Sequence, residues 1–451
     1  MPCEGSAAPR QTLSLVDGLV LVVGMVVGIG IFALPAQVAM FAGNGFNYLA
    51  LWLVGGALAL NGALCYAELA GRFPSAGGEY QFLSRAYGKN LAILFAWARC
   101  SVIQTGSIAL VAFVYGDYAQ SLLPLGAHGA AIHAAIIISI FTAINMAGTF
   151  QGTLAQKVFT SLDMLALVSL LAAGAVLILG GTASPAPVAA PSSGDGGMIG
   201  LAIVFVMLTY GGWNESAYLS AELKDGNRNM VRVLVLSILM ITALYFAVAF
   251  IYLQAVGFDA LAKSSTIAAD VMGAAFGPAG ATAIAIFICG SAISTLNATI
   301  FTGGRIYYEL GRDLPWLQKF GRWSPQGENP VNAFILQGAV ALLLVMLAVN
   351  LQKSGLQTMV DYITPIFWLF MTLVGVSLFL FRHRGQGESG GYRVPLYPVT
   401  PLIFVATCLY MLYSSVNYVQ QGTLIGLAML LAGVPLLFFR GRAQPASDAA
   451  E

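Results

Sequence analysis

The feature that most constrains this chain is a series of apolar runs, each about 20 residues long, that succeed one another along most of its length. Only 9% of the 451 residues are charged, and 58% are hydrophobic. Soluble domains average about 25% charged residues, so a chain of this composition cannot cover a water-facing surface. That excludes a soluble enzyme, a nucleic-acid-binding protein and a disordered scaffold, and it predicts a polytopic membrane protein.

A bilayer core about 30 Å thick is crossed by roughly 20 residues of α-helix. Because backbone polar groups in lipid must be satisfied within their own segment, the runs are expected to be helices and the fold to be all-α. The apolar runs predict twelve transmembrane helices, at residues 15–40, 45–70, 90–118, 129–149, 154–180, 199–222, 230–255, 277–309, 331–350, 356–381, 397–416 and 421–440.

The basic residues predict how the chain is oriented. Seventeen of the 20 Lys and Arg residues fall on one set of loops and tails, whereas only Lys263 and Lys353 fall on the opposite set. By the positive-inside rule, the tails 1–14 and 441–451 are both expected in the cytoplasm, with the protein in the plasma (inner) membrane. The one remaining basic residue, Arg99, lies inside the third span.

Two of the spans carry residues that break a helix near the middle of the membrane. The first span has Gly24, Gly28, Gly30 and Pro35, and the sixth has Gly-Gly followed by Trp, Asn and Glu at 211–215. Gly destabilises a helix interior by about 1 kcal/mol and Pro by about 3 kcal/mol. For Gly24 and Gly28, a close contact between two helices is the alternative explanation.

The second break comes five spans after the first. This spacing predicts two five-helix repeats of inverted topology, 15–180 and 199–381, followed by two added helices within 397–440. Broken helices at corresponding positions of two repeats mark the substrate site of a transporter. Free N–H groups at a half-helix N-terminus attract a carboxylate, and free carbonyl groups attract an ammonium group or a cation. Two such breaks together form a receptor for an amino acid zwitterion.

Several short motifs in register resemble those of the amino acid–polyamine–organocation (APC) transporter superfamily, and within it the L-type amino acid transporter branch. The motifs are Gly28-Ile-Gly30-Ile-Phe32, Tyr210-Gly-Gly-Trp-Asn214, Glu222 with Arg228-Asn229, Phe301-Thr302 with Arg305, Tyr392-Arg-Val-Pro395 and the stretch Glu68 to Tyr80. The resemblance implies a five-plus-five inverted repeat, alternating access, and a substrate between spans 1 and 6.

The resemblance also implies a substrate site built from the two breaks. Its residues are Val26, Val27, Gly28, Ile29, Gly30, Leu208, Thr209, Tyr210, Gly211 and Asn214. The carboxylate of the substrate would lie against N–H groups around 29–30, and its amine would face carbonyl groups at 26–27 and 208–209. Residues 208–210 would also shape the side-chain pocket and the gate.

Span 5 departs from the family pattern. Many relatives have a lysine in a Val-Phe-Thr-x-x-Lys pattern, where this chain has Val158-Phe-Thr-Ser-Leu-Asp163. A charged residue at a helix centre costs about 2.5–3.5 kcal/mol, so Asp163 is expected to have a function or a partner. Span 8 carries hydroxyls on one face, as the sodium-coupled relatives do. Those relatives also use carbonyl groups of span 1, which the resemblance maps to Gly24 and Val27. Together with Asp163, Ser291, Ser294 and Thr295, these groups are the predicted coupling site for Na⁺ or H⁺.

Alternatives remain for these polar groups. The hydroxyls of span 8 could bond to carbonyl groups of their own helix. Asp163 could form an ion pair with Arg99, because both lie roughly 13 Å along their helices from the same side. Glu215, beyond the second break, could attract the substrate amine or line a vestibule, and Glu68 and Glu79 are expected to make cytoplasmic gate or loop contacts.

The sequence contains no motif of a membrane enzyme or an ATP-driven pump. We therefore predict a secondary active transporter, not an enzyme, for neutral L-amino acids, with no cofactor besides a coupling ion. The alternatives are an amine or polyamine carrier, an amino acid exchanger and, from a different class, a channel or substrate-sensing receptor. The loop 122–128 lacks the cysteine that links relatives to a heavy chain, so lipid and substrate are the expected partners, without nucleic acid or a disulfide-linked heavy chain.

Overall fold

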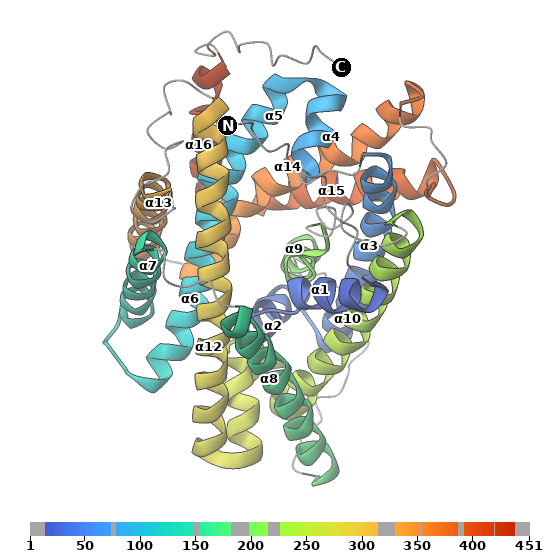
Figure 1. Cartoon of the computed structure of the whole chain (residues 1–451). Helices are drawn as coiled ribbons and strands as arrows, with labels where there is room; N and C mark the ends of the chain where they lie inside the picture. Colours follow the sequence, from blue (N-terminus) through green and yellow to red (C-terminus); the bar gives the residue numbers. More distant parts are fainter. Residues whose placement is uncertain are drawn as a thin grey trace. The chain divides into compact units, whose positions relative to one another are not determined.

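The computed structural model is built of helices (Figure 1). It describes residues 14–73, 78–147, 153–181, 198–214, 226–313, 330–351, 354–386, 392–418 and 420–437, and it contains no strand within them. Among these residues, eight helices are long and apolar enough to cross a bilayer, and four shorter apolar helices accompany them. The predicted all-α polytopic membrane fold is confirmed.

Most of the expected spans are single helices. They are α3 (Gly45–Arg72), α7 (Gly129–Ala147), α8 (Thr153–Leu179), α10 (Gly226–Val256), α12 (Ile267–Asp313), α13 (Val331–Val349), α14 (Gly355–His383), α15 (Val399–Tyr418) and α16 (Gln420–Leu431). Span 1 is divided into α1 (Leu15–Val26) and α2 (Gly30–Ala42), and the described part of span 6 is α9 (Ile199–Thr209).

Three local features were not expected from the apolar runs. Span 3 consists of α5 (Lys89–Ala98) and α6 (Thr105–Leu122), joined by a π-helical turn at Arg99–Gln104. Span 8 begins after Gly277, whose backbone is not helical (φ 69°, ψ −165°), and a separate helical segment at 267–276 precedes it; the label α12 covers both. A ten-residue helix, α4 (Gly78–Tyr87), precedes span 3. It is too short and too polar to register as an apolar run.

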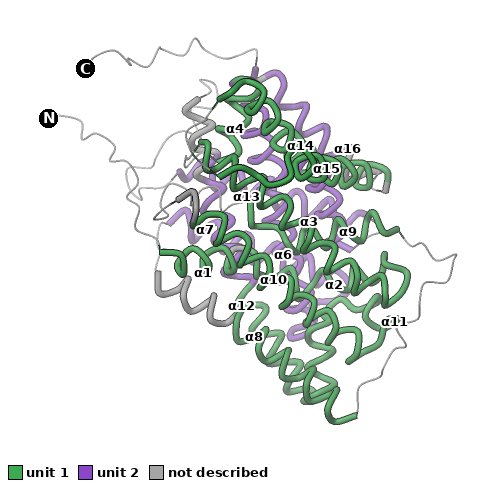
Figure 2. The backbone as a smooth tube through the Cα atoms, turned by 90° about the vertical axis from the view of Figure 1, so that its right-hand side faces the viewer, with its two compact units in different colours: residues 1–88, 157–291, 368–418 green, residues 89–156, 292–367, 419–451 purple. Residues whose placement is uncertain are grey.

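The chain forms two compact units (Figure 2). Unit 1 comprises residues 1–88, 157–291 and 368–418, and unit 2 comprises residues 89–156, 292–367 and 419–451. In unit 1, α2 packs on α9 and α3 packs on α10, and in unit 2, α7 packs on α13. These pairs are spans 1 and 6, 2 and 7, and 4 and 9. Each of these pairs joins two spans that are five apart in the chain; the division into two inverted repeats stays a prediction.

Side-chain amides hold α12 within unit 2. Gln104 donates from Nε2 to the Thr299 carbonyl (2.7 Å), and Gln337 donates from Nε2 to the Ile300 carbonyl (3.0 Å). Asn145 donates to Asn297 Oδ1 at 2.8 Å. Lipid chains cannot form hydrogen bonds as water can. Amide side chains in a membrane therefore bond to neighbouring helices and fix their orientation, which apolar packing alone would not do.

A buried carboxylate joins three segments of unit 1. Glu68, near the end of α3, is fully buried. It accepts hydrogen bonds from Arg382 of α14 (2.9 and 2.6 Å), from Arg72 (2.9 Å) and from the backbone N–H of Val394 (2.7 Å). Glu68 therefore makes more than the expected loop contact, because its carboxylate is paired with two arginines and a backbone N–H group.

Candidate functional site

The first break lies where the sequence places three glycines. The helix α1 ends at Val26, Val27 is extended (φ −77°, ψ 100°), and α2 begins at Gly30. We call residues 27–29 the span-1 break. Within the described part of the chain, a Cβ atom added to Gly24 or Gly28 would have no atom within 4 Å. This argues against the alternative explanation, a close helix contact at these two glycines.

The second break follows α9. The chain leaves the helix at Tyr210, and the Gly211 N–H turns back to the Leu208 carbonyl at 3.0 Å. Gly212 has φ of +109°, a conformation that residues with a Cβ atom rarely adopt. We call residues 210–214 the span-6 break. The rest of the predicted span, including Glu215, lies outside the described residues.

The two breaks meet inside unit 1. The helices α2 and α9 pack together, and a Cβ atom on Gly30 would lie 3.5 Å from both Cα and Cγ2 of Thr209. The first turn of α2 therefore rests directly on the last turn of α9. An N-terminal turn supplies free N–H groups and a C-terminal turn supplies free carbonyl groups, so donors and acceptors for a zwitterion lie side by side.

A tyrosine that the sequence analysis did not single out bridges both breaks. The hydroxyl of Tyr245, on α10, lies 2.8 Å from the Val26 carbonyl oxygen and 3.3 Å from the Thr209 carbonyl oxygen. These carbonyls end α1 and α9, and both belong to the set predicted to face the substrate amine. Tyr245 is fully buried.

A second tyrosine on the same helix donates a hydrogen bond to a carbonyl group of α2 that has lost its helical donor. Pro35 has no N–H to give to the carbonyl of Ile31, four residues earlier. The hydroxyl of Tyr252 donates to that carbonyl at 3.2 Å. Tyr245 and Tyr252 are two helical turns apart and therefore share a face of α10. This spacing is the sequence signal that could have revealed them.

The span-6 break is held by further hydrogen bonds. The Tyr210 hydroxyl donates to the Trp52 carbonyl on α3 at 2.9 Å. Asn214 donates from Nδ2 to Glu79 Oε1 on α4 at 2.9 Å, and the Tyr66 hydroxyl donates to the same oxygen at 3.1 Å. Glu79 is buried, so the unexpected helix α4 brings a carboxylate to the end of the break.

The predicted coupling residues are partly brought together. In unit 1 the Ser291 hydroxyl on α12 faces the Asp163 carboxyl on α8. Asp163 Oδ1 and Ser291 Oγ are both buried, and neither atom makes a hydrogen bond within the described part of the chain. The alternative of bonding to the own helix is seen one turn on, from Thr299 to the Thr295 carbonyl, but not at Ser291.

The other coupling residues are distributed over both units. Gly24 and Val27 belong to unit 1, where α1 packs on α10. Ser294 and Thr295 follow on α12 but belong to unit 2, as does Arg99 in the π-helical turn. Their part in a cation site, and the ion pair of Arg99 with Asp163, remain predictions. No cluster of three or more His, Cys, Asp or Glu side chains that could hold a metal occurs among the described residues.

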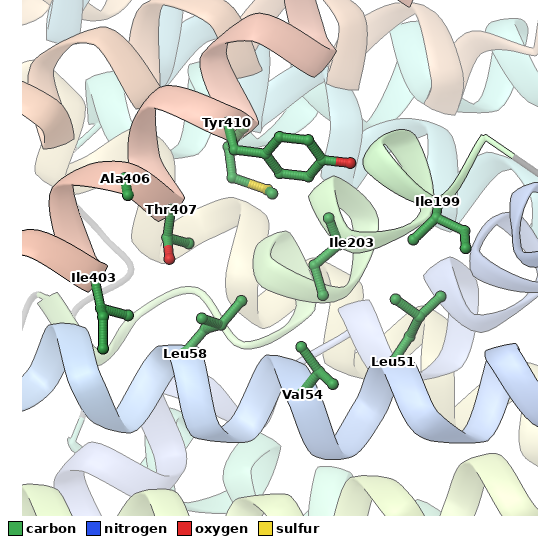
Figure 3. Close-up of a pocket in the computed structure, with 10 residues that line it drawn as sticks. Leu51, Val54, Leu58, Ile199, Ile203, Ile403, Ala406, Thr407 and Tyr410 are labelled. Carbon is green, nitrogen blue, oxygen red and sulfur yellow. The ribbon is translucent and has the colours of Figure 1, made fainter.

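An apolar groove of about 390 Å³ lies elsewhere in unit 1 (Figure 3). Leu51, Val54 and Leu58 of α3 form one wall, Ile199 and Ile203 of α9 a second, and α15 the third, with Ile403, Ala406, Thr407, Tyr410 and Met411. It contains no break residue and no charged group. A zwitterion would lose its hydration there without replacement, so the groove is not the substrate site.

Comparisons with known proteins agree with this geometry. A family model described as "Amino acid permease" matches residues 13–434. The b(0,+)-type amino acid transporter 1 of Mus musculus is 26% identical over 416 residues, 90% of this chain and 83% of that protein. The serine/threonine exchanger SteT of Bacillus subtilis (strain 168) is 26% identical over 434 residues, 95% of this chain and 96% of SteT. The large neutral amino acids transporter small subunit 2 of Homo sapiens is 28% identical over 444 residues, 96% of this chain and 81% of that protein.

Because the family model spans nearly the whole chain, the protein belongs to the amino acid permease family, and the resemblance to the L-type branch of the APC superfamily is confirmed.

Proposed function

We propose that this chain is a secondary carrier that moves a neutral amino acid across the membrane by alternating access. The observation that carries the proposal is the direct packing of the first turn of α2 on the last turn of α9, between the span-1 break and the span-6 break. The chain is not an enzyme, because its family and the relatives named above are transporters.

The chemistry of the two helix ends suits a zwitterion. The N–H groups at Ile29 and Gly30 would bind the carboxylate, and the carbonyl groups of Val26 and Thr209 would accept from the amine. Each helix terminus contributes about 0.3–1 kcal/mol to binding an opposite charge, and up to about 2 kcal/mol where it is partly buried. Recognition by main-chain groups leaves the side chain of the substrate free to vary.

A neutral side chain fits the lining of the breaks best. Residues 26–30 and 208–214 contain no charged side chain. The names of SteT and of the large neutral amino acids transporter point to serine, threonine and large neutral amino acids for those relatives. An amine or polyamine carrier would need a more acidic lining than these two segments offer.

Reconstitution into liposomes tests the proposal. Purified protein should take up labelled neutral amino acids with saturation kinetics, and unlabelled amino acid inside the vesicles should accelerate that uptake if the carrier exchanges. A panel of neutral, basic and acidic amino acids and a polyamine identifies the substrate class. Failure of every amino acid to give saturable uptake would refute the proposal.

We also propose that a cation or proton couples to transport at Asp163 and Ser291. The support is the pair of buried, unpartnered oxygen atoms on facing side chains. Oxygen ligands suit a hard cation such as Na⁺, and a carboxyl group can carry a proton instead. Gly24 and Val27, which belong to unit 1 as Asp163 and Ser291 do, would contribute carbonyl oxygens.

Imposed gradients test this coupling. Uptake should rise under either an inward Na⁺ gradient or an inward H⁺ gradient, and Asp163→Asn should abolish that stimulation. Asp259→Asn, at an exposed carboxylate on the short helix Phe258–Leu261, is the control. Full gradient-driven accumulation by Asp163→Asn would refute the role of Asp163.

Membrane, orientation and partners complete the proposal. The chain is a multi-pass membrane protein, and the positive-inside rule supports a plasma-membrane location with both termini in the cytoplasm. The cysteine-free loop between α6 and α7 supports a carrier without a disulfide-linked heavy chain. Purification without reductant, followed by a non-reducing gel, tests that expectation.

A further inference from the structure

A tyrosine hydroxyl occupies the acceptors that the proposed function assigns to the substrate amine. Tyr245 donates toward the Val26 carbonyl (2.8 Å) and the Thr209 carbonyl (3.3 Å). A hydroxyl has one hydrogen, so it satisfies one of the two carbonyls well and the other poorly. An ammonium group has three hydrogens, and it would satisfy both.

These two carbonyls need a donor from outside their own helices. Val26 is the last residue of α1 and Thr209 the last residue of α9, so both carbonyls belong to the final helical turn, where the supply of helical N–H donors ends. Both residues are buried, at 5% and 3% exposure. A buried carbonyl without a donor is costly, and the cost is greatest where water is excluded.

A carrier excludes water from its site each time it changes the side on which the site opens. When it turns over with substrate, the ammonium group supplies the donors. When it turns over without substrate, a donor must come from the protein, and in this structure the hydroxyl of Tyr245 lies within hydrogen-bonding distance of both carbonyls.

We infer that the Tyr245 hydroxyl stands in for the ammonium group of the substrate when the carrier reorients empty, and that it thereby permits net transport in addition to exchange. The inference rests on the proposed function, because it requires that the substrate amine bind at the same carbonyls. Tyr245 acts as a positioning residue for the two helix ends.

A purely structural role for Tyr245 predicts a different result. If the hydroxyl only pins α1 to α9, its loss weakens the site in loaded and empty carriers alike, and exchange and net transport fall by the same factor. If it stands in for the substrate, its loss raises the barrier of the empty carrier selectively. The ratio of net transport to exchange separates the two roles.

The chain offers a matched control two turns away. Tyr252 lies on the same face of α10, is fully buried, and donates to a carbonyl of span 1 that lacks its own helical donor, that of Ile31. It differs from Tyr245 in that it contacts one carbonyl group, not two, and in that this carbonyl lies within α2, beyond the break. Tyr252→Phe should therefore leave the ratio of net transport to exchange at the parent value, even if both rates decrease.

The experiment uses the full chain in proteoliposomes and an amino acid that the parent protein transports. Exchange is measured with saturating unlabelled amino acid inside, and net uptake with none inside. Tyr245→Phe should lower the ratio of net uptake to exchange about tenfold, the effect of one buried acceptor left without a donor. An equal fall of both rates or an unchanged ratio would overturn the inference.

Two further results keep the test decisive. If Tyr245→Phe is not recovered as folded protein, Tyr245→His, which keeps a ring N–H donor, should retain a ratio near that of the parent, and a tenfold lower ratio would count against the inference. A parent protein that exchanges but shows no net uptake also overturns it. A parent protein without saturable uptake in either mode refutes the proposed function instead.

Discussion

The charge centre at Glu68 gives a prediction whose size can be worked from the structure. The carboxylate is fully buried and accepts from Arg382 through Nε and Nη2, from Arg72 and from the Val394 N–H. Glu68→Gln keeps the shape of the side chain but removes the charge. It also replaces one accepting oxygen with an NH₂ group that faces donors.

Breaking one partner of a buried ion pair costs about 3–5 kcal/mol, because the remaining charge is left buried and uncompensated. We expect Glu68→Gln to lose about 3 kcal/mol of unfolding free energy. Unfolding entropies of about 2.1 cal/mol/K per residue, over 451 residues, convert this loss to a decrease in Tm of at least about 3 °C.

Thermal unfolding of the purified protein in detergent, followed by tryptophan fluorescence, measures this decrease. Asp259→Asn, at an exposed carboxylate, should change Tm by less than about 1 °C. Arg382→Gln added to Glu68→Gln should cost less than Arg382→Gln alone, because the pair is already broken. Additive costs, or a Glu68→Gln variant that melts with the parent, would refute the reasoning.

Three further predictions concern the breaks and the packing of unit 2. Gly212→Ala should cost about 1–3 kcal/mol and lower uptake, because φ at this position is +109°; a variant with parental melting and uptake would show that the turn tolerates a Cβ atom. Glu79→Gln should weaken the hydrogen bond to Asn214 and raise the substrate concentration for half-maximal uptake about fivefold. Asn214→Asp should raise that concentration more, because it places two carboxylates together. Equal values for the parent and both variants would contradict this prediction. Gly303→Ala should destabilise the fold by about 1–3 kcal/mol, because the new methyl group overlaps the side-chain amide of Gln337, and Gln337→Ala in the same chain should recover part of that loss in a thermal melt.

Apolar length and helix breakers were sufficient to predict the spans and both breaks. The glycines at 24–30 and at 211–212 are local signals, because Gly and Pro act on the helix in which they occur. The helix α4 escaped prediction because polar and charged residues such as Glu79 and Arg85 separate its apolar residues, so that its ten residues never form an apolar run.

The tyrosine at the centre of the site escaped prediction for a different reason. Tyr245 and Val26 are 219 residues apart, and a hydroxyl in an apolar helix gives no sign of which distant carbonyl it will reach. Asp163, in contrast, stood out because a carboxylate is expensive in a membrane helix. The prediction that Ser291 belongs with it follows from the hydroxyl spacing on span 8; Ser291 lies near Asp163, and a shared coupling site stays a prediction.

The central claim is that main-chain groups at two broken helices bind both the carboxylate and the ammonium group of an amino acid. Competition against uptake of a labelled substrate tests it most directly, with two analogues that keep the side chain but lack either the carboxylate or the amine. The account predicts that each analogue needs at least about tenfold more than the intact amino acid for half-inhibition, since each loses charge-assisted hydrogen bonds worth about 1.5–3 kcal/mol. Either analogue competing as well as the amino acid would contradict the account.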